Sequence, residues 1–444
     1  MKFRLSVMMF LQYAIWGAWL PILYPYLLGH LQFALADVSK IFAAAAVGAI
    51  VGPFIAGQVA DRFFATEKFL AASHLLGAVL VWMLAKQDSV NGFLVLSTLY
   101  GVIYAPTLAL TNSLSFHHLV DRDRDFGRVR LWGTIGWIAA GIAVGHWLDR
   151  YTPTGPETTA ALREAAWNAH RVDAFKLSAL LGALLGLYSL TLPHTPPRRD
   201  VAHTSAIGKA LGYAMKRPLA LLFLLAIPMS CVHQFYFVHA STFLTRFQSG
   251  AAGDFSNSLN AILGVGGGGL MTIGQMSEIA VLALVTVLAK QMSRKSLLAL
   301  GLAAYAARMA LFCYTDSVAT ILLGVALHGF CFGCFIFVAF MVVDEETPSD
   351  VRASAQNLFN LVIVGIGFIV GSWFAGSLVG GWARGKVLPA GTPPDAAIPE
   401  ALQRDYWTHL FSVPMWIALG CLVVLLVAYP GGKRSANADG AAAS

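Results

Sequence analysis

The chain has 444 residues, of which 57% are hydrophobic and only 12% are charged. An ordinary soluble domain carries about a quarter charged residues, so this composition excludes a typical soluble enzyme or binding domain and indicates a membrane protein. The formal net charge of +7 alone would suit a nucleic-acid-binding protein, but the placement of the basic residues, described below, argues against that class.

Twelve apolar runs are long enough to cross a membrane. A hydrocarbon core about 30 Å thick requires about twenty apolar residues in a helix. The predicted spans are residues 6–29, 38–60, 69–86, 92–115, 130–149, 172–192, 217–243, 271–290, 294–314, 317–343, 354–381 and 406–430. The predicted fold class is therefore an all-α membrane protein of twelve transmembrane helices. The first span lacks a small-residue cleavage site, so we expect it to be retained and not removed as a signal peptide.

The spans fall into two sets of six around a polar connection. We expect an N-terminal six-helix bundle at 1–192, a cytoplasmic linker at 193–216, a C-terminal six-helix bundle at 217–430 and a disordered cytoplasmic tail at 431–444. With both termini in the cytoplasm, about 19 Lys and Arg fall on the cytoplasmic side and about 8 on the other, which is the positive-inside bias. This asymmetry predicts that the basic loops face the cytoplasm and its anionic lipid and do not bind nucleic acid.

Neither the cysteines nor the glycine run predicts a disulfide, a metal site or a nucleotide-binding loop. All five cysteines lie within predicted spans, where they behave as small apolar residues, so no disulfide is expected. The "CFGC" sequence at 331–334 has the spacing of a redox or metal pair, but its apolar context favours packing. "GVGGGG" at 264–269 lacks the strand and helix of a nucleotide-binding loop and is interpreted as an extracellular turn. We expect neither a cofactor nor a metal.

A charged turn follows the second span of each half. "GQVADRFFATEK" at 57–68 resembles the Gly-x-x-x-Asp-Arg loop of the major facilitator superfamily, in which an aspartate and nearby basic side chains latch the two halves in one state. Asp61, Arg62 and Lys68 fit this gating pattern, although a glycine and further basic residues of the motif are missing. The alternative is an ordinary charged cytoplasmic turn. "LAKQMSRK" at 288–295 occupies the equivalent turn of the second half.

Polar residues inside the spans are candidates for function, because ionisable groups there normally face water or one another. Gln275 and Glu278 are three residues apart and therefore share one face of a helix. Two further sets each follow the spacing i, i+4 and i+7, which also places each set on one face: Arg130, Thr134 and Trp137, and Gln12, Trp16 and Trp19. Other polar residues within spans are Asn112, His233, Gln234, His239, Arg308, His328, Asn357 and Asn360.

Several of these residues have a structural alternative. Trp19 could serve as core packing or an interfacial anchor, and Arg130 could extend its side chain to the headgroups. Arg308 could be a structural partner of a helix end or a carbonyl. The asparagines are typical of interhelical hydrogen bonding. A purely structural role is least expected for Glu278, because a buried carboxylate requires protonation or a partner.

The predicted chemistry is proton exchange next to a neutral, hydrogen-bonding solute. A carboxyl group in a cavity can load and release a proton as water access alternates, which would couple solute movement to a proton gradient. The Gln275 amide offers both a donor and an acceptor. Aromatic faces that could stack on a ring are those of Trp16, Trp19, Trp137 and Phe332.

Six sequences in order carry a family resemblance: "FLQYAIWGAWL", "YAPTLALTNSLSF", "VRLWGTIGW", "SLTLPH", "GQMSEI" and "VRASAQNLF". Together they resemble the nucleoside:proton symporter family of the major facilitator superfamily, the bacterial nucleoside permeases. The resemblance implies a central site between two halves, alternating access, and import of nucleosides with protons. It implies that the site contains Arg130, Thr134, Trp137, Gln234, Gln275, Glu278, His328 and Phe332, with Glu278 as a proton-coupling residue.

The chain departs from the family at two positions. The better-known permeases carry an aspartate where this chain has Gly333, and an asparagine where it has Phe237. Either the specificity differs or His328 and its neighbours replace the missing hydrogen bonds. Glu278 must then carry more of the proton coupling, aided by His328, whose unperturbed pKa of about 6.5 suits reversible protonation. The acids at 344–346 are expected to serve a cytoplasmic gate with Arg352.

Together with this resemblance, the sequence therefore predicts a monomeric, proton-coupled importer of nucleosides in the inner membrane of a bacterium. The nearest alternative is a transporter of the same fold for another neutral polar solute, such as a sugar or glycoside, or a uniporter. A membrane sensor or an enzyme working in lipid is a more distant alternative. The sequence has no nucleophile and base pair, no metal-spaced His/Cys set and no soluble output domain, so we do not expect an enzyme.

Overall fold

The computed structural model describes residues 1–55, 64–155, 157–196, 204–249, 254–266, 268–348, 351–393 and 397–430. These residues form helices and loops, with no strand among them, because helices satisfy every backbone hydrogen bond within an apolar segment. The first helices are α1 (Lys2–Trp19), η1 (Leu20–Ile22), α2 (Leu23–Pro25), η2 (Tyr26–His30), α3 (Leu35–Ile55), α5 (Thr66–Leu84), α6 (Val90–His118), α7 (Arg122–Asp149), α8 (Ala160–His170), α9 (Val172–Ser189) and α10 (Thr204–Ala214).

The remaining helices follow the linker. They are α11 (Leu219–Ser249), α12 (Asp254–Leu263), α13 (Gly268–Gln291), α14 (Arg294–Tyr314), α15 (Val318–Ala326), α16 (His328–Phe330), η4 (Cys331–Phe337), α17 (Val338–Glu345), α18 (Arg352–Asn360), η5 (Leu361–Ile366), α19 (Gly367–Trp373), η6 (Phe374–Gly380), α20 (Gly381–Val387) and α21 (Glu400–Ala428). The described part of the predicted linker includes the helix α10, which was not among the predicted spans because its 11 residues are too few to cross a membrane.

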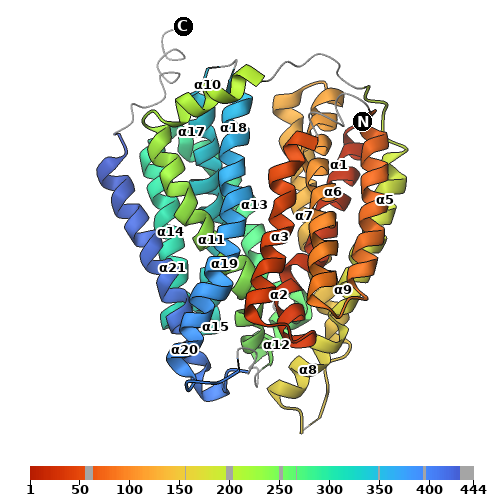
Figure 1. Ribbon diagram of the computed structural model, residues 1–444, viewed down its shortest axis with the longest axis vertical. Helices are drawn as coiled ribbons and strands as arrows, with labels where there is room; N and C mark the ends of the chain where they lie inside the picture. The colour runs from red at the N-terminus through yellow and green to blue at the C-terminus, as the bar shows by residue number, and fades with distance from the viewer. Residues whose placement is uncertain are drawn as a thin grey trace. The chain divides into compact units, whose positions relative to one another are not determined.

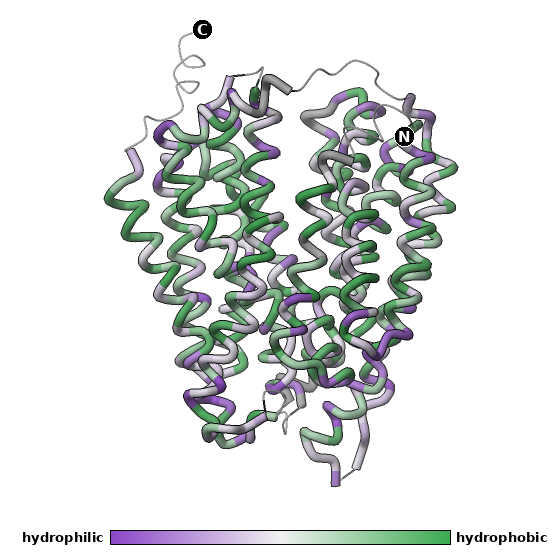
Figure 2. Tube along the Cα trace, in the orientation of Figure 1, coloured by the Kyte–Doolittle hydropathy of each residue, from purple (hydrophilic) through white to green (hydrophobic). Residues whose placement is uncertain are grey.

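Eleven helical segments of the described residues are long and apolar enough to cross a membrane. They confirm the all-α membrane fold. The predicted span 38–60 is helical as α3 up to Ile55, and the rest of it lies outside the described residues. Figure 2 shows hydrophobic residues along most of each helix and hydrophilic residues gathered toward the helix ends, as expected for segments surrounded by hydrocarbon.

Contacts group the chain into two compact units. Unit 1 comprises Met1–Val201, Tyr236–Thr272 and Thr392–Ala396, and unit 2 comprises Ala202–Phe235, Ile273–Gly391 and Ala397–Ser444. Unit 1 takes in the second half of α11, all of α12 and the first residues of α13 in addition to the first 201 residues. The predicted boundaries at 192 and 217 stay a prediction.

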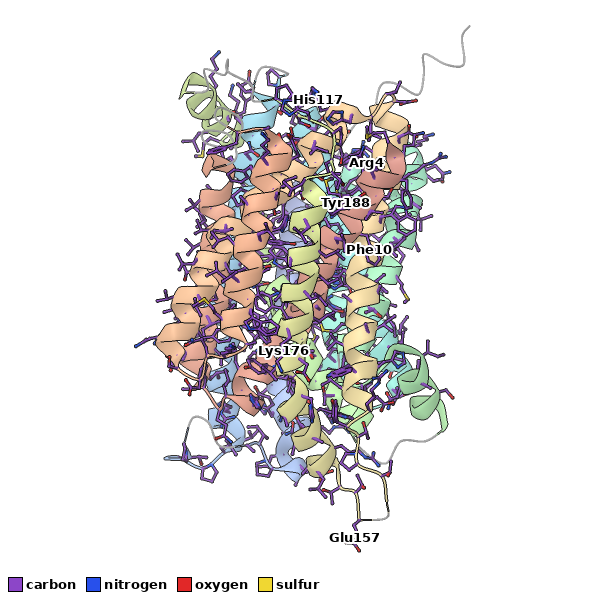
Figure 3. All side chains as sticks on the ribbon, turned by 90° about the vertical axis from the view of Figure 1, so that its right-hand side faces the viewer. Arg4, Phe10, His117, Glu157, Lys176 and Tyr188 are labelled. Atoms are coloured by element: carbon purple, nitrogen blue, oxygen red, sulfur yellow. The ribbon has the colours of Figure 1, made fainter. Side chains whose placement is uncertain are left out.

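In unit 1, helices α1, α3, α5, α6, α7 and α9 run side by side (Figure 1). A Cβ atom on Gly17 of α1 would lie 2.5 Å from the Trp137 carbonyl oxygen of α7, so these two backbones pack at close range, as small residues allow in membrane proteins. Helix α9 covers another side of α1, where the Tyr188 hydroxyl donates to the Arg4 carbonyl oxygen at 3.1 Å. Figure 3 shows Arg4, His117 and Tyr188 toward one end of the bundle and Glu157 at the other.

In unit 2, helix α14 packs against α21 and the π-helical segment η4. A Cβ atom on Gly301 of α14 would lie 2.5 Å from the Phe335 backbone nitrogen. Helix α13 reaches the same region, since the Ser277 hydroxyl donates to the Ala326 carbonyl oxygen at 2.5 Å. The π-helical turn in the predicted tenth span begins three residues after His328. Such irregular turns are frequent at functional sites, and here the turn adjoins the polar cluster described below.

Candidate functional site

In unit 1, Gln12 of α1 lies fully buried with one hydrogen-bonding end unused. Its Nε2 donates to the Thr107 hydroxyl at 2.8 Å, and its backbone carbonyl accepts from the Tyr104 hydroxyl. The side-chain Oε1 has no hydrogen-bond partner among the described residues. Since a buried unpaired acceptor is costly, Gln12 can accept a hydrogen bond from a ligand or a water molecule.

Trp16 and Trp19 have different surroundings, although they lie on one face of α1. Trp16 is half-buried and stacks on Tyr104 with ring centroids 4.7 Å apart. Trp19 is only 1% exposed and packs against Phe175 and Tyr100, at 5.2 and 5.8 Å. Trp16 therefore keeps aromatic surface for a ligand ring, whereas Trp19 belongs to the core of unit 1. Direct contact between Trp19 and substrate stays a prediction.

The predicted face of α7 is half-buried along its length. Arg130, Thr134 and Trp137 all have partial exposure. The Arg130 guanidinium carbon lies 4.0 Å from the centroid of the Tyr13 ring of α1, which is cation–π geometry. The structure thus places Gln12, Trp16 and the three α7 residues on two adjacent helices of unit 1.

In unit 2, two glutamine side chains repeat the pattern of Gln12. Gln234 of α11 is 3% exposed, and its Nε2 donates to the Ser372 hydroxyl of α19 at 2.8 Å. Gln275 of α13 is 6% exposed. The Oε1 atoms of both have no hydrogen-bond partner among the described residues. Each amide therefore offers an acceptor in an otherwise apolar setting.

Glu278, His328 and Arg308 form a charged chain across three helices of unit 2. The Arg308 Nη1 lies 2.9 Å from the His328 Nδ1, and the His328 Nε2 lies 3.9 Å from the Glu278 Oε2. Arg308 is fully buried and the His328 side chain is 2% exposed, whereas the Glu278 side chain is 17% exposed. Of these three groups, the carboxylate is thus the most exposed.

Two further groups support this chain. The His233 Nδ1 lies 2.7 Å from the Tyr305 hydroxyl, and the His233 ring stacks on His328 with centroids 5.5 Å apart. The Arg308 guanidinium carbon lies 5.2 Å from the Tyr305 ring centroid. From the sequence, His233 was identified only as a polar residue within a span, and Arg308 as such a residue or a structural partner. Tyr305 was not identified as a candidate. Its position three residues before Arg308, on the same face of a predicted helix, was the available signal.

Phe332 is half-buried beside Gly333 in the π-helical segment η4. A Cβ atom on Gly333 would lie 2.9 Å from the Cγ1 of Val281, which is itself buried in α13. A side chain at position 333 would therefore require Val281 to shift. In this chain the position adjoins apolar side chains of α13.

Of the predicted gating residues, Asp61 and Arg62 lie outside the described residues, and Lys68 is exposed in the first turn of α5. The Arg352 Nε lies 3.6 Å from Asp344 Oδ1. The neighbouring turn adds a two-pronged ion pair, because Arg294 donates through Nε and Nη2 to Glu345 at 3.1 and 2.5 Å. The acids after the tenth span thus pair with basic residues of two other helices.

Comparisons with known proteins agree with this architecture. The sequence model of the family described as nucleoside H+ symporter matches residues 1–430. The putative nucleoside transporter YegT of Escherichia coli strain K12 is 32% identical over 390 residues, which is 85% of this chain and 84% of YegT. The nucleoside permease NupG of the same organism is 26% identical, covering 85% of this chain and 88% of NupG. The xanthosine permease is 29% identical, covering 85% and 87%.

Solved structures show the same fold. A crystal structure of the nucleoside transporter NupG matches with a TM-score of 0.76 at 24% identity, covering 96% of this chain and 99% of that chain. A crystal structure of a D-xylose-proton symporter matches with a TM-score of 0.66 at 14% identity, covering 98% and 99%. The chain therefore has the major facilitator fold, as predicted.

Proposed function

We propose that this chain, which belongs to the nucleoside H+ symporter family, imports nucleosides with protons across the inner membrane of a bacterium. It is a multi-pass membrane transporter and not an enzyme. Proton-coupled nucleoside transport follows from the family and from relatives such as NupG. The direction of transport, the cytoplasmic location of both termini and a monomeric state are parts of the proposal.

The proton-coupling pair is Glu278 with His328. The single observation that carries this assignment is the 3.9 Å approach of the His328 Nε2 to the Glu278 Oε2, with the carboxylate at the accessible end of a buried polar chain. A carboxyl group in this setting binds a proton when water reaches it from outside and releases the proton when water reaches it from inside. Glu278 supplies the exchangeable oxygen, and His328 faces it with a ring nitrogen.

The substrate is held by amides and aromatic rings. Three glutamine side chains have an Oε1 without a partner among the described residues, and these acceptors suit the hydroxyl and N–H donors of a nucleoside: Gln12, Gln234 and Gln275. The half-buried rings that can stack on a base are Trp16, Trp137 and Phe332. Arg130 and Thr134 add donors along α7. Trp19 acts from the core by supporting Tyr100.

Transport proceeds by alternating access, in which the two halves rock about a central site. Arg352 with Asp344 latches the cytoplasmic side of the C-terminal bundle. Asp61, Arg62 and Lys68 have the corresponding role in the N-terminal bundle.

The test is uptake of labelled uridine and adenosine into proteoliposomes under an imposed inward proton gradient. We expect gradient-stimulated uptake that stops when the gradient is collapsed by a protonophore. Inserted, folded protein that shows no stimulated uptake of any nucleoside would overturn the assignment. Labelled xylose and maltose serve as controls. Transport of these sugars in preference to nucleosides would indicate a sugar transporter, an alternative that the family membership does not support.

A further inference from the structure

We infer that Arg308 is a positioning residue that holds His328 in its neutral form, so that Glu278 alone carries the coupled proton. The inference rests on the proposed function and narrows it from a proton-coupling pair to one proton site. It predicts one proton for each nucleoside.

The contact between Arg308 and His328 fixes where the histidine hydrogen is. A guanidinium group has only donors, so the 2.9 Å contact from the Arg308 Nη1 requires the His328 Nδ1 to be the acceptor. The one ring hydrogen of the neutral imidazole must then be on Nε2. That atom is the one 3.9 Å from the Glu278 Oε2. The His328 Nε2–H group therefore faces the Glu278 carboxylate. The distance is too long for a hydrogen bond, but the N–H dipole still attracts the negative charge of the carboxylate.

A second proton on His328 would have to bind Nδ1. It would remove the acceptor of the Arg308 contact and place an imidazolium directly against a guanidinium, both of them buried. Beside the ring lie the His233 ring of α11, with the Tyr305 hydroxyl of α14 bonded to it, and the Glu278 carboxylate of α13. Only the carboxylate would favour a second proton, and its 3.9 Å distance from Nε2 is longer than the 2.9 Å between the guanidinium and Nδ1.

Arg308 also explains why Glu278 can be an anion between transport cycles. Arg308 is a fully buried cation, and a buried charge requires compensation. The His328 imidazole lies between this cation and the Glu278 carboxylate and contacts both. In the cycle, an O–H bond forms on the Glu278 carboxylate when it takes H+ from outside water, and the bond breaks when H+ leaves to inside water. The Nε2–H bond of His328 stays intact throughout.

The packing at Gly333 supports a single proton site. Val281 fills the space that a side chain at position 333 would need, with its Cγ1 2.9 Å from the ideal Cβ position. The sequence has no acid beside Phe332, and a side chain added at position 333 would require Val281 to move.

The first test needs no variant. The reversal potential of uridine flux is measured in proteoliposomes holding the wild-type chain, with the proton and uridine gradients set independently. Because uridine is neutral, the potential at zero net flux gives the number of protons for each uridine. We expect one, and a value of two would overturn the inference while leaving proton-coupled nucleoside transport intact.

The second test is His328→Gln. The glutamine carbonyl can accept from Arg308 and its amide can donate to Glu278, but it cannot take up a proton. We expect gradient-driven uptake and uridine exchange to fall together, with their ratio within about twofold of wild type. Loss of gradient stimulation with exchange retained would make His328 a proton carrier and overturn the inference.

The third test is Arg308→Gln, with Arg404→Gln as the matched control on an exposed ion pair with Asp316. Removing the buried guanidinium changes the electrostatic surroundings of both His328 and Glu278, so the pH profile of uridine exchange should shift relative to wild type. The control should leave it unchanged. A purely structural role for Arg308 would lower the rate without moving the profile, which would overturn the inference. If this variant does not fold, the first two measurements still decide the matter.

Discussion

Replacing Gly333 with aspartate restores the acid that the better-known permeases carry, and the structure predicts that it will not be tolerated alone. The new Cβ would lie 2.9 Å from the Val281 Cγ1, whereas carbon atoms pack best at about 3.5–4.0 Å. Relieving an overlap of at least about 0.6 Å in a packed core costs about 1–3 kcal/mol. The carboxylate would add a desolvation cost beside the buried valine.

Two further variants separate these contributions. Gly333→Ala adds the same Cβ without a charge, so it reports the steric part alone. The double variant Gly333→Asp with Val281→Ala removes the clashing methyl groups, and the two changes should be non-additive by about 0.5–3 kcal/mol. If the double variant transports, its proton number should rise from one to two.

The assay is thermal unfolding of the purified, monodisperse protein, followed by tryptophan fluorescence, together with uridine flux in proteoliposomes. We expect Gly333→Asp to have the lowest unfolding temperature, Gly333→Ala an intermediate one, and the double variant a recovered one relative to Gly333→Asp. A Gly333→Asp protein as stable as wild type would refute the packing argument, because it would mean that Val281 does not occupy the space for this side chain.

Three other changes test separate parts of the structure. Gly17→Ala should lower the unfolding temperature, because its Cβ would lie 2.5 Å from the Trp137 carbonyl oxygen. The control Gly420→Ala, whose Cβ would have nothing within 4 Å, should be neutral or stabilising by up to about 1 kcal/mol. Equal effects of the two variants would contradict the close packing of α1 and α7. Gln275→Leu should raise the KM for uridine about tenfold or more through loss of a hydrogen bond, with protein stability retained, and an unchanged KM would remove this residue from the site. Trp16→Leu should weaken nucleoside binding in a thermal-shift titration more than Trp16→Phe does, since phenylalanine keeps an aromatic face; equal weakening by both would argue against stacking.

The helices were predictable because the cause of each is local. A run of apolar residues long enough to cross the hydrocarbon core is a property of the sequence itself, and α13 and α14 appear within a few residues of their predicted bounds. The shared face of Gln275 and Glu278 follows equally from helical spacing. Helix α10 was missed because its amphipathic pattern is brief.

The contacts between helices were not predictable from spacing. Arg308 and His328 are 20 residues apart in the chain and meet at 2.9 Å. Around them, Gly301 lets α14 approach η4 closely, and Gly329 lets α16 approach α13. Which face of α14 meets α16 depends on that packing, and no periodicity within one helix encodes it. The approach of His328 to Glu278 was likewise not predicted, since His328 was expected only to aid Glu278 in proton coupling. Similarly, the core position of Trp19 depends on Phe175 of a distant helix.

The most direct test of a proton site at Glu278 is the steady-state accumulation of uridine under a pH gradient, with the membrane potential clamped at zero. With one coupled proton, the wild-type chain should concentrate uridine about tenfold for each pH unit of gradient. Glu278→Gln should equilibrate uridine to equal concentrations on both sides while still exchanging it. Accumulation by Glu278→Gln to the wild-type level would contradict the account, because the coupled proton would then reside elsewhere.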